Sequence, residues 1–120
     1  MINFNELNSL ISNDAAGWKE ALSSTRGVYL ITDSESGDQY VGSATGANGI
    51  WGRWRDYAKS GHGNNKIMID RVQNIETFAG NLKFSILETL GNLATRQDGI
   101  AAEARWKSKL GKRATILNAN

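Results

Sequence analysis

A short β-hairpin is the sequence feature that most restricts the fold. Residues 27–32, Gly-Val-Tyr-Leu-Ile-Thr, are rich in β-branched and aromatic side chains, and they end at a turn-rich segment, residues 33–38. The strand pattern resumes at residues 39–42, Gln-Tyr-Val-Gly. Two such runs joined by a polar turn that contains glycine predict adjacent antiparallel strands. The fold therefore contains an antiparallel sheet.

Helical periodicity surrounds this hairpin. Apolar residues recur at helical spacing, which predicts two short helices within residues 2–25 and further helices at residues 50–60, 66–78 and 93–110. Residues 82–87, Leu-Lys-Phe-Ser-Ile-Leu, alternate as a third strand does. We therefore expect an α+β fold, with a small three-stranded antiparallel sheet flanked by helices.

The length and the missing cysteines limit the chemistry. The chain of 120 residues suits one domain, with residues 1–25 as a helical N-terminal extension and residues 26–120 as its core. A chain without cysteine has no disulfide, cysteine nucleophile or thiolate-bound zinc, and the single histidine, His62, excludes multi-histidine metal sites. Any metal must be held by oxygen ligands.

The distribution of apolar and charged residues restricts the partners. No apolar run approaches the roughly 20 residues of a membrane span, and none resembles a secretory signal, so we expect a cytoplasmic protein without a membrane partner. The net charge of +2 is too small to argue by itself for nucleic acid. Basic residues gather near the C-terminus, where they suit a phosphate backbone or, equally, a solvated helix face: Arg105, Lys107, Lys109, Lys112 and Arg113.

Two tyrosines are expected on one face of the hairpin. Strand alternation across a loop with an even number of residues directs Tyr29 and Tyr40 to the same side. Gly42 belongs to that side too, so a gap is expected beside the phenols. Cross-strand aromatic packing is the commoner explanation for such a pair.

One arginine of the helix at residues 50–60 differs from its charged neighbours. At 100° per residue, Arg53 borders the apolar arc, whereas Arg55 and Asp56 lie on the opposite side. Tyr57 follows Arg53 by one turn, so guanidinium and phenol can address a common point. An arginine at the edge of an apolar face can also simply extend its head group into solvent.

A carboxylate on the last helix needs a partner. Glu103 lies on the same face as Trp106 and Leu110, where an unpaired charge is costly. A salt bridge is the commoner solution, and a divalent cation is another. Two phenols, an arginine and a carboxylate together suit metal-assisted phosphoryl chemistry, since the chain has no glycine-rich phosphate loop ending in Lys-Ser or Lys-Thr.

The order of these residues resembles the GIY-YIG nuclease family. Gly27-Val-Tyr29 is followed by Tyr40-Val-Gly42, Arg53-Trp54, Glu103 and Asn118. The likeness spans residues 27–118. It also includes Ser43-Ala44, Gly61-His62, Phe84-Ser-Ile-Leu-Glu88, Trp106 and Leu117.

The resemblance implies hydrolysis of DNA phosphodiester bonds with one divalent cation, Mg²⁺ or Mn²⁺. By this likeness Glu103 is the metal ligand, and Arg53 holds the scissile phosphate and stabilises its developing charge. Tyr29 and Tyr40 organise the attacking water, with Tyr40 as the general base. A free tyrosine has a pKa of about 10, so this base requires a neighbour that lowers its pKa.

Further positions follow from the same likeness. Tyr57 occupies a catalytic position that is histidine in many members, and His62 matches a loop histidine. Asn118 matches a structural or phosphate-side asparagine. Independently of the likeness, Lys107 and Lys109 of the basic cluster near the C-terminus are expected to contact the substrate, and so is Gly42. Valine replaces isoleucine in both tripeptides, and residues 43–52 lack the lysine that some relatives place near the second tyrosine.

Two other classes of function stay open. The chain could keep the fold and bind nucleic acid without cutting it, or it could be a structural domain with aromatic core residues. The resemblance also implies that target specificity comes from an attached domain or an oligomer partner.

Overall fold

The expected hairpin lies at the centre of the sheet. A computed structural model describes residues 1–13, 17–74 and 77–117. In it β2 (Arg26–Asp33) and β3 (Gln39–Ala44) pair antiparallel, and β4 (Leu82–Leu90) pairs antiparallel with the other edge of β2. The three predicted strands are therefore confirmed, each slightly longer than its sequence pattern.

The prediction of a three-stranded antiparallel sheet is wrong, because the sheet has five strands and is mixed. β1 (Ile2–Asn3) pairs antiparallel with β4, and β5 (Ala114–Ile116) pairs parallel with β3, which gives the order β1-β4-β2-β3-β5. Strands of two and three residues are too short to display an alternation in the sequence. The fold class is α+β, as expected.

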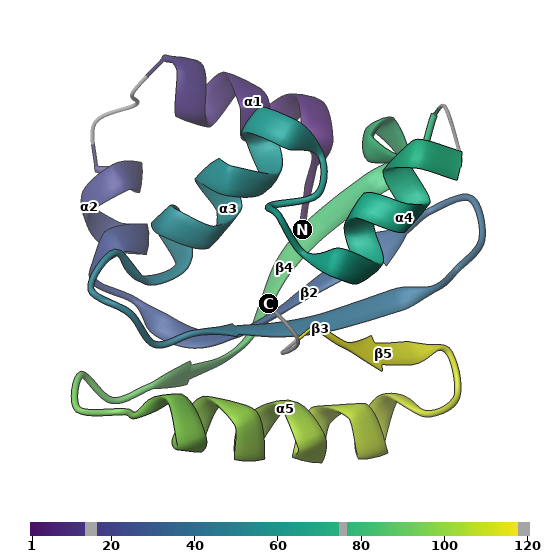
Figure 1. Cartoon of the computed structure of the whole chain (residues 1–120). Coiled ribbons are helices and arrows are strands. Elements are labelled where there is room, and N and C mark those ends of the chain that lie inside the picture. The colour runs from purple at the N-terminus through teal and green to yellow at the C-terminus, as the bar shows by residue number, and fades with distance from the viewer. Residues whose placement is uncertain (14–16, 75–76, 118–120) are drawn as a thin grey trace.

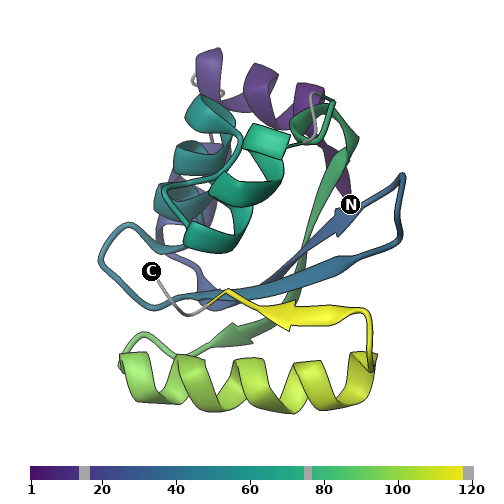
Figure 2. The ribbon, with the colours of Figure 1, turned by 45° about the vertical axis from the view of Figure 1, so that its right-hand side comes forward.

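Helices cover both faces of this sheet (Figures 1 and 2). One face carries the four helices that precede β4 in the chain, and α5 alone covers the other face. The side chains of β2 alternate between the two: Tyr29 and Ile31 pack under the first group, and Val28 and Leu30 pack on α5. The helices are α1 (Phe4–Ser12), α2 (Trp18–Ser23), α3 (Gly49–Ser60), α4 (Lys66–Asn74) and α5 (Arg96–Leu110), with a 3₁₀ turn η1 (Ala79–Asn81).

The helix ends differ from the sequence expectations for local reasons. Helix α5 begins at Arg96 instead of residue 93, because Thr95 and Asp98 form a capping box that fixes the first turn. Helix α4 ends at Asn74, and residues 75–76 lie outside the described chain. None of the described helices is both long and apolar enough to cross a lipid bilayer.

Candidate active site

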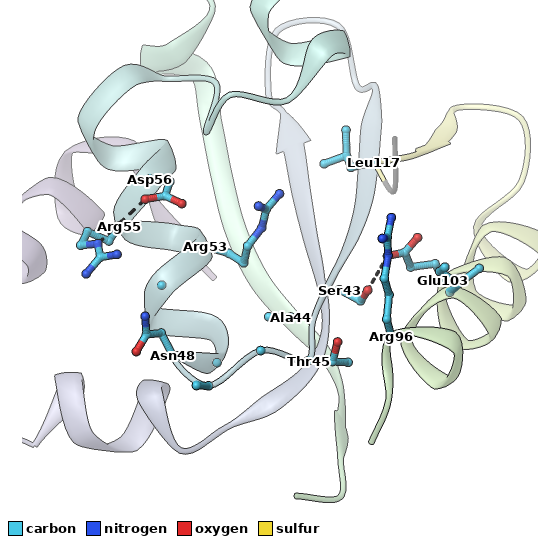
Figure 3. Close-up of a pocket in the computed structure, with 15 residues that line it drawn as sticks. Ser43, Ala44, Thr45, Asn48, Arg53, Arg55, Asp56, Arg96, Glu103 and Leu117 are labelled. Carbon is cyan, nitrogen blue, oxygen red and sulfur yellow. Dashed lines mark hydrogen bonds and ion pairs between the residues drawn. The ribbon is translucent and has the colours of Figure 1, made fainter. Parts of the chain in front are cut away.

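The candidate site is a pocket at the uncovered end of β3 (Figure 3). β5 pairs with β3 only from Gln39 to Val41, so among the described residues no strand covers the outer edge of residues 42–44. A pocket of about 400 Å³ lies there, lined by the end of β3, residues 45–48 and the starts of α3 and α5. Because α3 and α5 cover opposite faces of the sheet, this edge is where their side chains can meet.

Glu103 enters the pocket from α5 as a buried carboxylate. The residue is 1% exposed, and its Oε1 accepts a hydrogen bond of 2.5 Å from Ser43 Oγ. Its Oε2 is also buried, and it has no hydrogen-bond partner in the described part of the chain. Burial raises the pKa of Glu103 above its ordinary value, against the lowering effect of the Ser43 bond and of the charges on Arg53 and Arg96.

The salt bridge expected as the commoner solution for Glu103 is not seen in the described part of the chain. Within residues 1–13, 17–74 and 77–117, no lysine or arginine lies at ion-pair distance from its carboxylate. The prediction that Glu103 lies on a buried helix face is confirmed, since Trp106 and Leu110 pack with the residues under the sheet.

Gly99 allows α5 to approach β3 closely enough for the Ser43 bond. A Cβ on Gly99 would lie 2.8 Å from Ser43 Oγ and 3.0 Å from Thr45 Cγ2. A glycine inside a helix weakens it by roughly 1 kcal/mol relative to alanine. Here the close packing of helix on strand explains why a glycine stands at this position.

Arg53 enters the pocket from α3, and two buried phenols lie beneath it. The hydroxyls of Tyr29 and Tyr57 are 3.3 Å apart, and the guanidinium carbon of Arg53 lies 6.0 Å from the centroid of the Tyr57 ring. Burial lowers the pKa of Arg53, but the two phenols outweigh burial and the net pKa is raised. Burial also raises the pKa of Tyr57 well above its ordinary value, so Tyr57 is a neutral phenol at physiological pH.

The shared face of the two strand tyrosines is confirmed by the register of the hairpin. Tyr29 stands opposite Gly42, and Tyr40 stands opposite Ile31, so all four side-chain positions belong to one face. The gap expected beside Gly42 is filled, because a Cβ there would lie 2.4 Å from Cζ of Tyr29. Because Gly42 has no side chain, the Tyr29 ring occupies this space, and no room is left there for a ligand.

Tyr40 is directed toward the turn end of the hairpin, away from the pocket lining. Its ring packs edge-on against Phe78, with the ring centroids 6.2 Å apart. Burial raises the pKa of Tyr40, the charge and hydrogen bond of Arg71 lower it, and Asp38 and Asp33 raise it. None of these neighbours lines the pocket of Glu103, so the structure does not bring Tyr40 to the carboxylate.

The remaining predicted site residues that the structure describes do not line this pocket. His62 shapes its own loop, where its Nδ1 accepts a hydrogen bond of 2.9 Å from the backbone of Asn64. Lys107 donates to the carbonyl of Ala114 at 2.8 Å, and Lys109 Nζ lies 5.0 Å from the centroid of the Trp106 ring. Asn118 lies outside the described residues.

Sequence reasoning gave no role in the site to Ser43 and Arg96, which are among the residues that line the pocket. Arg96 stands seven residues, or two helical turns, before Glu103 in α5, so helical spacing places both on one side of the helix. Ser43 follows Gly42 in β3 and therefore points to the face that α5 covers. Strand alternation could have identified Ser43, and helical spacing could have identified Arg96. With a helix expected to begin at residue 93, however, Arg96 does not stand at the helix start.

The donor set of the pocket limits the metal that it could hold. The described residues contain no group of three or more histidine, cysteine, aspartate or glutamate side chains suited to a metal ion. A single carboxylate with one unpartnered oxygen fits a cation such as Mg²⁺, which keeps several water ligands and takes one or two carboxylates plus substrate phosphates.

Comparison of this chain with protein-family models, with curated proteins and with solved structures finds no match.

Proposed function

We propose that this protein is a metal-dependent DNA endonuclease that hydrolyses phosphodiester bonds through a GIY-YIG-type active site. The observation that carries the proposal is the buried Glu103, which keeps an unpartnered Oε2 in the same pocket that Arg53 lines. An unsatisfied buried carboxylate costs stability. Such a cost at the mouth of a pocket is typical of a group kept for function.

Arg53 is proposed to hold the scissile phosphate. A guanidinium can donate two parallel hydrogen bonds to the oxygens of a phosphate. The charge that develops on those oxygens during hydrolysis is then stabilised by a donor already in position. The raised pKa of Arg53 keeps it cationic throughout the pH range in which proteins are stable.

Tyr29 and Tyr57 are proposed to position Arg53 rather than to accept a proton. Both are fully buried, their hydroxyls lie 3.3 Å apart, and both phenols interact with the guanidinium. Burial raises the pKa of Tyr57, which makes this phenol a poor base at neutral pH. The same reasoning removes Tyr40 from the role of general base in this proposal, because burial raises its pKa as well.

Glu103 is proposed as the protein ligand of one Mg²⁺ or Mn²⁺ ion. When bound, such an ion lowers the pKa of a coordinated water and balances charge on the phosphate. Ser43 fixes Oε1 of Glu103 by its hydrogen bond, so Oε2 is the oxygen left for the ion. A ligand oriented in this way by a neighbouring hydroxyl is a common feature of metal sites.

The order of the motifs supports the GIY-YIG assignment of both fold and activity. In that reading β2, β3 and β4 are the family's three antiparallel strands, and β1 and β5 are additions to its edges. DNA is the proposed partner, with target choice supplied by a further domain or a second copy.

A nucleic-acid-binding module that does not cut is the second candidate, and the basic residues near the C-terminus are its support. Most of them already have intramolecular partners. Arg105 lies 3.9 Å from Glu88, and Arg113 lies 3.5 Å from Asp38. This local engagement favours the nuclease over a module that relies on those charges.

The test is the relaxation of supercoiled plasmid in Mg²⁺, in Mn²⁺ and in chelator. We expect nicking that requires a metal and that falls by at least about 100-fold in Glu103→Gln. Glu88→Gln is the matched control, because Glu88 also contacts α5 but lies outside the pocket. Metal-independent binding without nicking by the wild type would instead support the binding module.

A further inference from the structure

We infer that Arg96 is a second phosphate-binding residue of this site, which holds a neighbouring phosphate of the strand that Arg53 contacts. The inference rests on the proposed function, and it adds a residue that neither the sequence motifs nor the resemblance pointed to. It is carried by the position of Arg96, by the charge balance of the pocket and by the stability of α5.

Arg96 and Arg53 approach the pocket from opposite faces of the sheet. Arg53 comes from α3, and Arg96 is the first residue of α5. Both line the pocket, and the charges of both act on the carboxylate of Glu103. Figure 3 shows Arg53 on the side of α3 and Arg96 extended beside Glu103 on the side of α5. Two guanidiniums placed in this way suit two phosphates of one chain better than a single phosphate.

The charges that line the pocket leave an excess of positive charge. Arg55 and Asp56 form a pair at 3.9 Å and offset each other. The described lining then holds two further arginines, Arg53 and Arg96, and one further carboxylate, that of Glu103. In the described part of the chain the Arg96 side chain makes no hydrogen bond and no ion pair, so its guanidinium has its donors available for a ligand. A bound anion would neutralise this excess positive charge.

The stability of α5 does not explain an arginine at this position. The first turn of a helix favours negative side chains, and a cation there is unfavourable. The helix start is fixed by Thr95, which accepts from the backbone of Asp98, and by Asp98, which accepts from the backbone of Thr95. Replacing Arg96 therefore removes none of the contacts that fix the helix, and the variant is expected to fold.

The experiment compares Arg96→Ala with Arg105→Ala, an exposed arginine of the same helix outside the pocket. Binding to a short DNA duplex is measured by fluorescence anisotropy in chelator at several salt concentrations, and plasmid nicking is measured in Mg²⁺. We expect Arg96→Ala to weaken binding about tenfold and to reduce the slope of log K against log salt by about 1. In nicking, KM rises about tenfold, while kcat changes less than about threefold.

Each result supports or overturns the inference. Arg105→Ala should change binding less than about twofold, and Arg96→Glu should weaken binding further than Arg96→Ala. Equal effects of Arg96→Ala and Arg105→Ala in a wild type that binds and nicks DNA would overturn the role of Arg96 and leave the proposed function intact. A loss of kcat without a change in binding would also overturn it. A wild type that neither binds nor nicks DNA would overturn both.

Discussion

The substitution Glu103→Gln should stabilise the metal-free protein while it abolishes cleavage. Glutamine keeps an oxygen that can accept the Ser43 bond but carries no charge, and the site buries the residue to 1% exposure. An unpartnered buried acceptor costs about 1–3 kcal/mol, and Arg53 and Arg96 offset part of this. We expect the free energy of unfolding at pH 7.5 to rise by about 1 kcal/mol, which raises the melting temperature by about 4 °C.

The pH dependence of this difference has a fixed sign. Burial raises the pKa of Glu103, so the folded state holds the proton more tightly than the unfolded chain does. The contribution of Glu103 to the free energy of unfolding of the wild type is fully present below the ordinary glutamate pKa of about 4.3. This contribution is lost as pH rises through the raised pKa of Glu103 in the folded protein. The glutamine variant has no such loss. The gain from Glu103→Gln should therefore be near zero at about pH 4 and should grow as pH rises through the raised pKa of Glu103.

Magnesium should reverse the order of stability, so that the wild type becomes more stable than Glu103→Gln. An ion present at about ten times its Kd stabilises the protein that binds it by about 1.4 kcal/mol, and the variant lacks the proposed ligand. The assay is thermal and urea unfolding at pH 4, 6 and 7.5, with and without Mg²⁺, with Glu88→Gln as a control expected to change stability by no more than about 0.5 kcal/mol. A metal-free variant less stable than the wild type by 1 kcal/mol or more would refute the reasoning, because Glu103 would then be a favourable structural charge.

Two further substitutions test the geometry around Arg53. Gly42→Ala should destabilise by about 1–3 kcal/mol in urea unfolding, because its Cβ meets the Tyr29 ring at 2.4 Å, whereas Gly91→Ala, with no atom within 4 Å, should be neutral or slightly stabilising; equal effects would show that the ring moves aside freely. Arg53→Lys should lower kcat for plasmid nicking by at least about 100-fold, since lysine keeps the charge but cannot donate in the bidentate way, and Arg55→Lys should change it less than threefold; comparable losses would mean that the guanidinium of Arg53 has no special position.

The core of the fold could be predicted from the sequence because its signals are local. The β-branched runs and the turn between them fix the hairpin, and parity alone places Tyr29 and Tyr40 on one face. Helical spacing likewise places Glu103 on the buried side of α5 and Arg53 at the border of the apolar arc of α3. These predictions need only the period of each element and not the distances between elements.

Which residues form the site could not be predicted from the sequence, because this depends on which part of the sheet edge has no paired strand among the described residues. A shared face does not imply a shared pocket: Tyr40 lies two strand positions from Gly42 and packs toward Phe78 instead. The resemblance assigns His62 to the site, but its Nδ1 accepts a local backbone hydrogen bond outside the pocket lining. β5 has three residues and shows no alternation in the sequence, yet its last pair, Val41 with Ile116, marks where strand pairing along β3 ends among the described residues.

The end of β5 links the fold to the proposed chemistry. Side chains on opposite faces of a continuous sheet are separated by its backbone. Arg53, on the face covered by α3, and Glu103, on the face covered by α5, can therefore contact one ligand only at an edge of the sheet. A longer β5 would continue along β3 and occupy the edge of residues 42–44, where the pocket lies. In the described part of the chain the edge of residues 42–44 has no strand partner, and Oε2 of the buried Glu103 beside it has no hydrogen-bond partner. Both features oppose stability, and both are what a phosphate and a hydrated cation would satisfy on binding.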